Sequence, residues 1–280
     1  MGRHEALIRK VTASPYYVYG KGLGLSAGLV SSFLGLEVEL LFLGQQIAAG
    51  DTVIDVGANL GVYSAYFARR VGRTGKVYAV EPLPQNISTI RRIVKIGKLP
   101  QINVIEGAAS NKEGEIVSLS VPKLLTGEPI HTEASLHISS SEVGHGSRYY
   151  EVAEIKVLSH TLDAIPCDGK VTLVKIDVEG AELLVLEGAQ QLISRHRPRI
   201  VCEIESRWTA RYGYTPNAVF DFFRDHNYAF YVCTAVGCAV TLLRCDGPII
   251  GANNYIFLPE EHPMDSNNLQ KIHYLYSFKY

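Results

Sequence analysis

Short apolar runs and helically spaced apolar residues alternate along most of the chain. The runs are typical of buried strands and lie at residues 52–56, 76–80, 102–105, 171–176, 199–204, 228–234 and 255–258. Apolar residues spaced three or four positions apart predict helices between them, at residues 60–71, 84–96, 181–193 and 216–226. Because parallel strands need helical crossovers, this order predicts an α/β fold with a doubly wound, mostly parallel seven-stranded sheet.

The N-terminal part follows a different pattern. Residues 1–50 predict a helical region whose last helix, at 36–49, stops at Gly50 just before the first strand. The apolar segment at 22–36 is predicted either to pack on the core or to act as a lid. No repeat and no flexible linker divides residues 51–260, which are therefore predicted to form one domain.

The alternation of strands and helices is interrupted by a β-rich insertion at residues 112–160. Residues 115–121 and 152–158 alternate as half-exposed strands do, and a polar segment rich in Ser, His and Gly separates them. Long insertions in compact domains are usually functional or disordered. The insertion is therefore either an acceptor-binding flap or a mobile loop.

The turn after the first strand carries the most informative chemistry. It contains Asp55, Gly57, Asn59 and Gly61, and the second strand ends on Glu81. A strand, glycine turn and helix in this order bind nucleotide-like ligands, and an acid at the tip of strand two accepts hydrogen bonds from ribose hydroxyls. An NAD-dependent oxidoreductase is disfavoured, because Asn59 replaces the second glycine of the dinucleotide motif and the Asp55 carboxylate would repel a pyrophosphate. The same carboxylate suits the cationic methionine end of S-adenosylmethionine.

Three motifs then resemble those of one known family. They are DVGANLG followed by VEP, KIDVEGAELLVLEGA, and RPRIVCEIE, and a late NNYIFLP is similar to the family's closing strand. Over roughly residues 37 to 259 the chain resembles the FkbM family of S-adenosylmethionine-dependent class I methyltransferases. The resemblance implies a last strand inserted antiparallel between the fifth and sixth.

Roles for individual residues of the cofactor site follow from the motifs and the resemblance. Asp55 is expected at the methionine amino group, with a helix N-cap as its alternative. Asn59 is expected to contact the carboxylate end or simply to adopt a left-handed turn. Glu81 is expected on the ribose, with a surface carboxylate as the alternative. The adenine is expected near residues 106–109, which include Gly107 and Ala108.

Acidic residues predict the catalytic side of the site. Asp177 and Glu179 follow the fourth strand, where they either serve the sulfonium and the acceptor or stabilise a helix N-terminus. An alcohol acceptor needs a general base, for which the candidates are Asp177, Glu179 and His137, with the other insertion histidines His131 and His145. Glu203 and Glu205 end the next strand on the same edge, and Lys175 is predicted to pair with a neighbouring acid or to reach the site. No metal is predicted, because no histidine completes a ligand pattern.

The resemblance implies the predicted function, S-adenosylmethionine-dependent O-methylation of a sugar or secondary-metabolite hydroxyl. The alternatives are N-methylation, a metal-assisted reaction, a non-catalytic module that binds S-adenosylmethionine, and the disfavoured oxidoreductase. The net charge of −1 and a pI near 6.8 suggest no general attraction to nucleic acid or anionic membranes.

Cellular context is predicted from the cysteines and the N-terminus. The five cysteines lack paired spacing and are read as reduced thiols. The N-terminus shows no secretory signal, and the apolar run at 23–36 is too short to span a bilayer, so a cytoplasmic location is predicted. The aromatic tail at 261–280 packs on the core or on a partner subunit, which leaves a homo-oligomer open.

Overall fold

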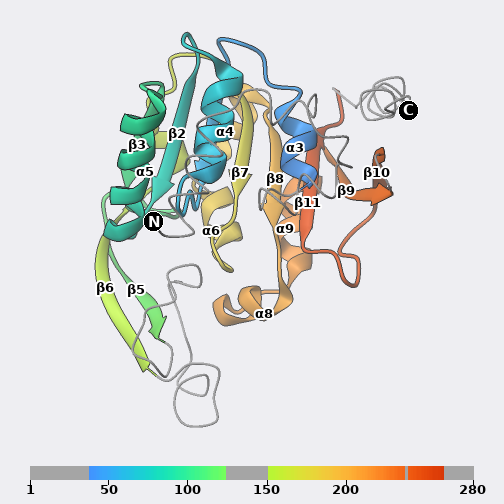
Figure 1. Ribbon diagram of the computed structural model, residues 1–280. Coiled ribbons are helices and arrows are strands. Elements are labelled where there is room, and N and C mark those ends of the chain that lie inside the picture. The colour runs from blue at the N-terminus through green and yellow to red at the C-terminus, as the bar shows by residue number, and fades with distance from the viewer. Residues whose placement is uncertain (1–37, 124–150, 237–238, 262–280) are drawn as a thin grey trace.

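A computed structural model describes residues 38–123, 151–236 and 239–261 of the chain (Figure 1). Its main sheet has eight strands in the order β10-β9-β11-β8-β7-β1-β2-β3. The strands are β1 Thr52–Val56, β2 Lys76–Glu81, β3 Ile102–Glu106, β7 Val171–Ile176, β8 Arg199–Glu203, β9 Tyr228–Val236, β10 Ala239–Cys245 and β11 Asn254–Pro259. The helices are α3 Val38–Gly44, α4 Val62–Val71, α5 Pro84–Gly97, α6 Glu182–Glu187, α7 Gln190–His196, α8 Ser206–Thr209 and α9 Pro216–Asp225.

The sheet confirms the predicted fold class. Strands β3, β2, β1, β7 and β8 pair in parallel, and β11 lies antiparallel between β8 and β9. The sheet has one strand more than the seven predicted, because β10 pairs antiparallel with β9 at the edge. This edge strand has one buried and one exposed leucine, Leu242 (6% exposed) and Leu243 (50% exposed), and its apolar run was not included among the predicted strands.

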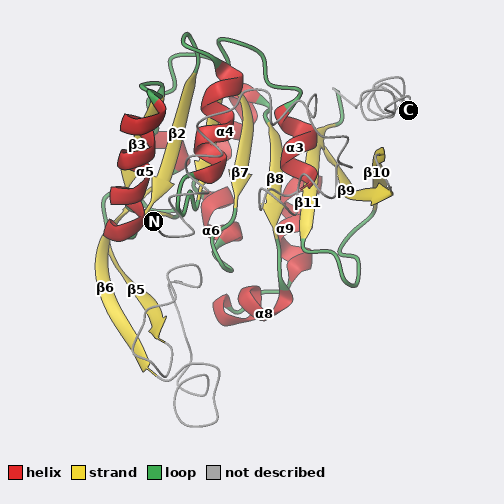
Figure 2. Cartoon of the chain, viewed as in Figure 1, coloured by secondary structure: helices red, strands yellow, loops and turns green. Residues whose placement is uncertain are grey.

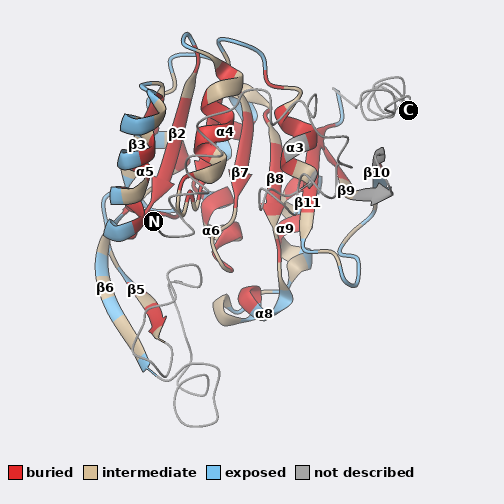
Figure 3. Ribbon diagram, viewed as in Figure 1, coloured by how far each residue is buried: buried red, intermediate tan, exposed pale blue. Residues whose placement is uncertain are grey.

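Helices cover both faces of the sheet (Figure 2). Alternate residues of β1 point to opposite faces, so Val53 packs with α3, α4 and α5 whereas Ile54 packs with α6, α7 and α9. The inner strands β2, β1, β7, β8 and β11 are thereby mostly buried (Figure 3). This arrangement leaves the carboxyl ends of the parallel strands as the edge on which a ligand can be bound.

Two predicted helices differ from those observed. The helix predicted at 181–193 is broken into α6 and α7 at Gly188, where the backbone of Ser110 leaves no room for a side chain. The helix predicted at 36–49 ends at Gly44, where the Tyr66 ring leaves no room for one. Both ends coincide with close tertiary contacts, which helical periodicity does not report.

The insertion contains strands, as predicted. Strands β5 Ile116–Lys123 and β6 Glu151–His160 form an antiparallel ribbon, and β6 also pairs with the two-residue strand β4 Ala108–Ala109. The ribbon extends from the β3 edge of the main sheet beyond the strand ends (Figure 1). The predictions made for the segment at 22–36, for the insertion histidines including His137, and for the tail from residue 262 onward lie outside the described residues.

In the parts of the chain that the structure describes, no helix is both long enough and apolar enough to cross a membrane.

Candidate functional site

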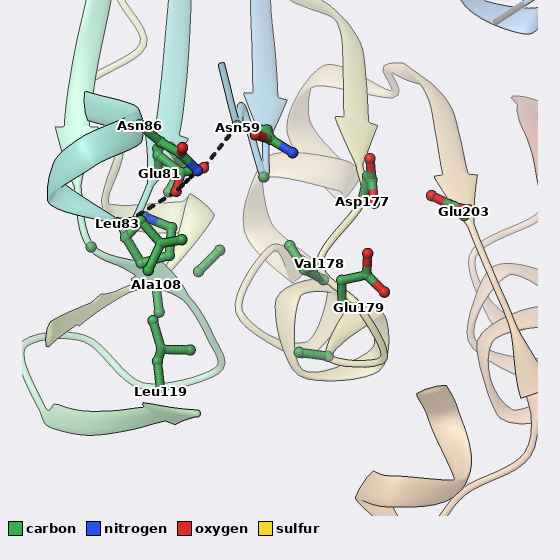
Figure 4. A pocket seen from close by; sticks show the side chains of 16 residues that line it. Asn59, Glu81, Leu83, Asn86, Ala108, Leu119, Asp177, Val178, Glu179 and Glu203 are labelled. Atoms are coloured by element: carbon green, nitrogen blue, oxygen red, sulfur yellow. Dashed lines mark hydrogen bonds between the residues drawn. The ribbon is translucent and has the colours of Figure 1, made fainter. Parts of the chain in front are cut away.

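A cavity lies at the carboxyl ends of the parallel strands (Figure 4). Its walls come from the turns after β1, β2, β3 and β7, from β5, and from the end of β8. The residues that line it are Gly57, Asn59, Val80, Glu81, Pro82, Leu83, Asn86, Gly107, Ala108, Ala109, Leu119, Asp177, Val178, Glu179, Ala181 and Glu203.

The turn after β1 brings two strand ends into close contact. Gly57 has a φ of 72°, and a Cβ there would overlap the carbonyl oxygen of Asp177. The next turn residue, Asn59, adopts the left-handed conformation with a φ of 50°. Its side-chain Oδ1 is buried without a hydrogen-bond partner among the described residues. The turn therefore presents an unused acceptor at the cavity wall.

Glu81 is held rigidly at the end of β2. Its carboxylate accepts hydrogen bonds from the backbone N–H groups of Asn59 (2.7 Å) and Leu83 (3.0 Å) and from the Asn86 side chain (3.0 Å). The residue is only 3% exposed, and burial raises the pKa of its carboxyl to about 7, although the three hydrogen bonds lower it. A surface turn carboxylate, the alternative role, is thus ruled out by its burial.

Asp55 lies beneath the cavity and does not line it. The residue is fully buried and accepts a hydrogen bond from Ser64 Oγ, and the Lys175 Nζ is 3.8 Å from its Oδ1. The same Nζ is 3.0 Å from the Asp177 Oδ2, which confirms the predicted pairing of the lysine with an acid. Burial raises the pKa of Asp55 above its usual value. Among the described residues Asp55 Oδ1 accepts no hydrogen bond, and the expected contact of Asp55 with a methionine amino group, direct or through water, stays a prediction.

The other predicted glycines divide between the cavity and the core. Gly61 does not line the cavity, and a Cβ there would approach Ile90 to 2.8 Å. Gly61 is also the N-cap of α4, so the alternative role of Asp55 as a helix N-cap does not apply to this helix. Gly107 and the adjacent Ala108 do line the cavity, as expected for the adenine region. Glu106 instead forms an ion pair with Arg91 outside the cavity.

Three acids form the opposite wall. Asp177 and Glu179 follow β7 and Glu203 ends β8, and all three line the cavity. Glu205 lies outside it and accepts a hydrogen bond from Asn253. Neither acid caps α6 by a hydrogen bond, because Ala181 is its N-cap and no side chain caps it, so stabilisation of the helix N-terminus by their charge stays the alternative.

A buried network supports the turn that carries these acids. Glu182 accepts a hydrogen bond from the Gly180 N–H (2.9 Å), and the Tyr214 hydroxyl lies 3.1 Å from Glu182 Oε2 and 2.5 Å from the Gly180 carbonyl. Burial raises the pKa of Glu182 to about 7. Gly180 also has no room for a side chain, because the backbone of Trp208 occupies that place. The turn is therefore fixed on both sides.

Sequence reasoning missed several residues of the cavity wall. Leu83 is the N-cap of α5 and Asn86 lies in its first turn, so the Pro at position 84 that opens α5 was the signal available for them. Leu119 comes from the insertion, and no signal in the sequence links it to the cavity.

Comparison with known proteins identifies the family. The model of the methyltransferase FkbM domain matches residues 55–230, which is more than half of the chain. The chain belongs to the FkbM methyltransferase family. The proteins of this family are S-adenosylmethionine-dependent methyltransferases, and membership sets aside the oxidoreductase alternative.

Two curated fungal proteins are similar to this FkbM methyltransferase. Methyltransferase 1 of Beauveria bassiana is 25% identical over 143 residues, which cover 49% of the chain and 57% of that protein. Methyltransferase sdnD of Sordaria araneosa is 26% identical over 157 residues, which cover 50% of the chain and 60% of that protein. The matched part of the chain thus spans less than two thirds of either relative.

Among solved structures, the methyltransferase FkbM from Methylobacillus flagellatus KT aligns with 91% of the chain and 59% of its own length, at 15% identity and a TM-score of 0.44.

Within the described part of this FkbM methyltransferase, no three His, Cys, Asp or Glu side chains lie close enough together to hold a metal ion.

Proposed function

We propose that this FkbM methyltransferase transfers a methyl group from S-adenosylmethionine to a hydroxyl of a small acceptor, a sugar or a secondary metabolite. The observation that carries the proposal is Glu81. It is a buried acid at the tip of β2 that three hydrogen bonds aim at the cavity. An acid so placed accepts hydrogen bonds from the two hydroxyls of a ribose.

The polarity of the cavity supports this placement of the donor. Beyond Glu81 and Asn86, apolar residues line the end at β2 and β3, whereas acids line the end at β7 and β8. S-Adenosylmethionine has the same polarity, with a flat adenine at one end and a sulfonium and ammonium at the other. The adenine would lie at Leu83 and Ala108, the ribose at Glu81, and the methionine end beside Asn59, whose unused Oδ1 can accept a hydrogen bond from it.

The residues of this chain would act mainly by positioning and by taking up a proton. When bound, the donor supplies an electrophilic methyl group on a sulfonium. Asp177 and Glu179 lie at the acidic end, where a carboxylate can orient an acceptor hydroxyl and accept its proton. The Lys175 ammonium fixes one oxygen of Asp177, and the left-handed backbone of Glu179 (φ 54°) sets the direction of its side chain. His137 stays a prediction as an alternative base.

The same acids would also serve an amine acceptor, and N-methylation is therefore the alternative. We also propose that the insertion at residues 112–160 takes part in acceptor binding, that the enzyme is cytoplasmic, and that its acceptor is a small molecule.

Titration calorimetry tests the donor site. We expect the purified protein to bind S-adenosylmethionine and S-adenosylhomocysteine with micromolar affinity and not to bind NAD. Glu81→Gln should weaken S-adenosylhomocysteine binding about ten-fold, since hydrogen bonds to a charged group contribute about 1.5–3 kcal/mol. Glu106→Gln is the matched control, because Glu106 ends the neighbouring strand beside Glu81 but lies outside the cavity. Equal affinities of the two variants would contradict the proposal.

Transfer of a radiolabelled methyl group to a panel of sugars, glycosides and polyketide alcohols tests the reaction. Asp177→Asn should keep donor binding and lose most of the turnover, roughly 100-fold for a general base. Turnover on amines alone would favour N-methylation. Donor binding without any turnover across alcohols and amines would identify a non-catalytic module.

A further inference from the structure

One residue of the cavity wall comes from the ribbon rather than from the α/β sheet. Most of β5 and β6 is exposed or half-buried (Figure 3), but Leu119 is only 3% exposed and Val121 only 4%. Leu119 lines the cavity near Ala108, at the end that also contains Leu83 (Figure 4). Val121 does not line it. Two buried residues on one face of one strand therefore differ in whether they meet the cavity.

The base of the ribbon is fixed to the sheet at this end. β6 pairs with β4, which carries Ala108. Ser159 of β6 is fully buried, and its hydroxyl accepts a hydrogen bond from the Glu115 N–H (3.1 Å) and donates one to the Lys112 carbonyl (2.7 Å). A side chain at Gly107 would overlap the Leu158 carbonyl, so the turn after β3 lies directly against β6. Leu119 is therefore held in a set position relative to the cavity.

We propose that Leu119 binds the adenine ring of the methyl donor, so that the ribbon of the insertion is part of the donor site. The inference rests on the donor placement proposed above. The walls at this end of the cavity are apolar, formed by Leu83, Ala108, Ala109 and Leu119. A flat aromatic ring inserted between them removes apolar surface from water on both sides and restores the dispersion contacts that a cavity wall lacks.

The competing explanation is that Leu119 only fills the inside of the ribbon. Val121 is the control for that explanation, because it lies two residues away on the same face and is equally buried. Truncation of either side chain removes apolar contacts within the ribbon. Only truncation of Leu119 removes contacts with a bound adenine.

The test measures S-adenosylhomocysteine binding by calorimetry for the full-length wild type, Leu119→Ala and Val121→Ala. Leu119→Ala should weaken binding about ten-fold, and Val121→Ala should change it less than two-fold, because the loss scales with the apolar area taken from the ligand. Adenosine should show the same loss with Leu119→Ala. Leu119→Met, which nearly conserves volume, should bind about as well as the wild type.

Thermal unfolding without ligand serves as the second measurement. The two alanine variants should unfold at similar temperatures, so that only the affinities separate them. If Leu119→Ala does not fold, the milder Leu119→Val and Leu119→Met replace it, and affinity should follow side-chain size. Equal affinities of the Leu119 and Val121 variants would overturn the inference alone. A wild type that binds no S-adenosylhomocysteine would overturn the donor placement and, with it, the inference.

Discussion

Replacement of Lys175 by Met tests the buried ion pairs beneath the cavity. The Lys175 side chain is 3% exposed and its Nζ lies 3.8 Å from the fully buried Asp55 carboxylate and 3.0 Å from that of Asp177. Met keeps most of the side-chain volume but removes the charge. Asp55 is then left as a buried carboxylate that only Ser64 stabilises with a hydrogen bond.

The expected cost is large and depends on pH. Removing one partner of a buried pair typically costs about 3–5 kcal/mol, because the other charge stays buried without compensation. Burial already raises the pKa of Asp55, and loss of the Lys175 charge, which lowers it, raises it further. The folded variant therefore holds a proton that the unfolded chain releases, so its stability falls as the pH rises, by up to about 1.4 kcal/mol per pH unit.

Urea unfolding of wild type and Lys175→Met at pH 5.5 and pH 8 measures both effects. The loss of unfolding free energy should be greater at pH 8, and Asp55→Asn added to the variant should recover part of it. Lys76→Met is the control, because Lys76 pairs with Asp168 at the surface and should matter far less. A loss at pH 8 of under about 1 kcal/mol, or an equal loss at both pH values, would refute the reasoning, since a buried charge cannot be left unpaired at so small a cost.

Two further predictions concern the same edge of the sheet. Burial raises the pKa of Glu81 and of Glu182 to about 7, so the folded state holds protons that the unfolded chain loses above the ordinary pKa of 4.5. The free energy of unfolding should therefore fall from pH 5 to pH 7. In a urea-unfolding series, either Glu→Gln variant should flatten this decline. An unchanged slope in both variants would contradict these raised pKa values. Gly57→Ala should prevent folding or S-adenosylhomocysteine binding, because its Cβ would overlap the Asp177 carbonyl. Gly114→Ala, with a similar φ of 75° but open space around it, should cost only about 1 kcal/mol in thermal unfolding, and equal effects of the two changes would refute the steric argument.

The parallel strands could be predicted closely because they are buried on both faces. β1 and β7 match the predicted ranges, since residues such as Val53 and Ile54 must both be apolar when each faces a different layer of helices. The break at Gly188 and the edge strand β10 were not predicted. Gly188 lies against the backbone of Ser110, a distant segment, and such a contact leaves no periodic signal. The apolar run of β10 was a signal in the sequence that was not used.

The residues of the cavity likewise divide into those that the sequence predicted and those that it did not. The motif around Glu81 predicted an acid at the edge where a ligand binds, and Glu81 lines the cavity there, because the position at a strand tip fixes its location. The motif around Asp55 did not reveal that Lys175, more than a hundred residues later, reaches this carboxylate from the neighbouring strand. Leu119 was missed for a similar reason, since its role follows from where the ribbon is anchored.

The pairing of β1 with β7 has a consequence for biosynthesis. β1 ends at Val56, but its partner β7 begins only at Val171, after the whole β2–β6 region has been made. At ribosomal rates of about 5–20 residues per second, one edge of β1 stays unpaired for on the order of ten seconds. The nascent chain carries that row of unpaired backbone N–H and C=O groups, a site for misassociation, until β7 emerges. Donor binding cannot assist folding before then, because one wall of its cavity has not yet been translated.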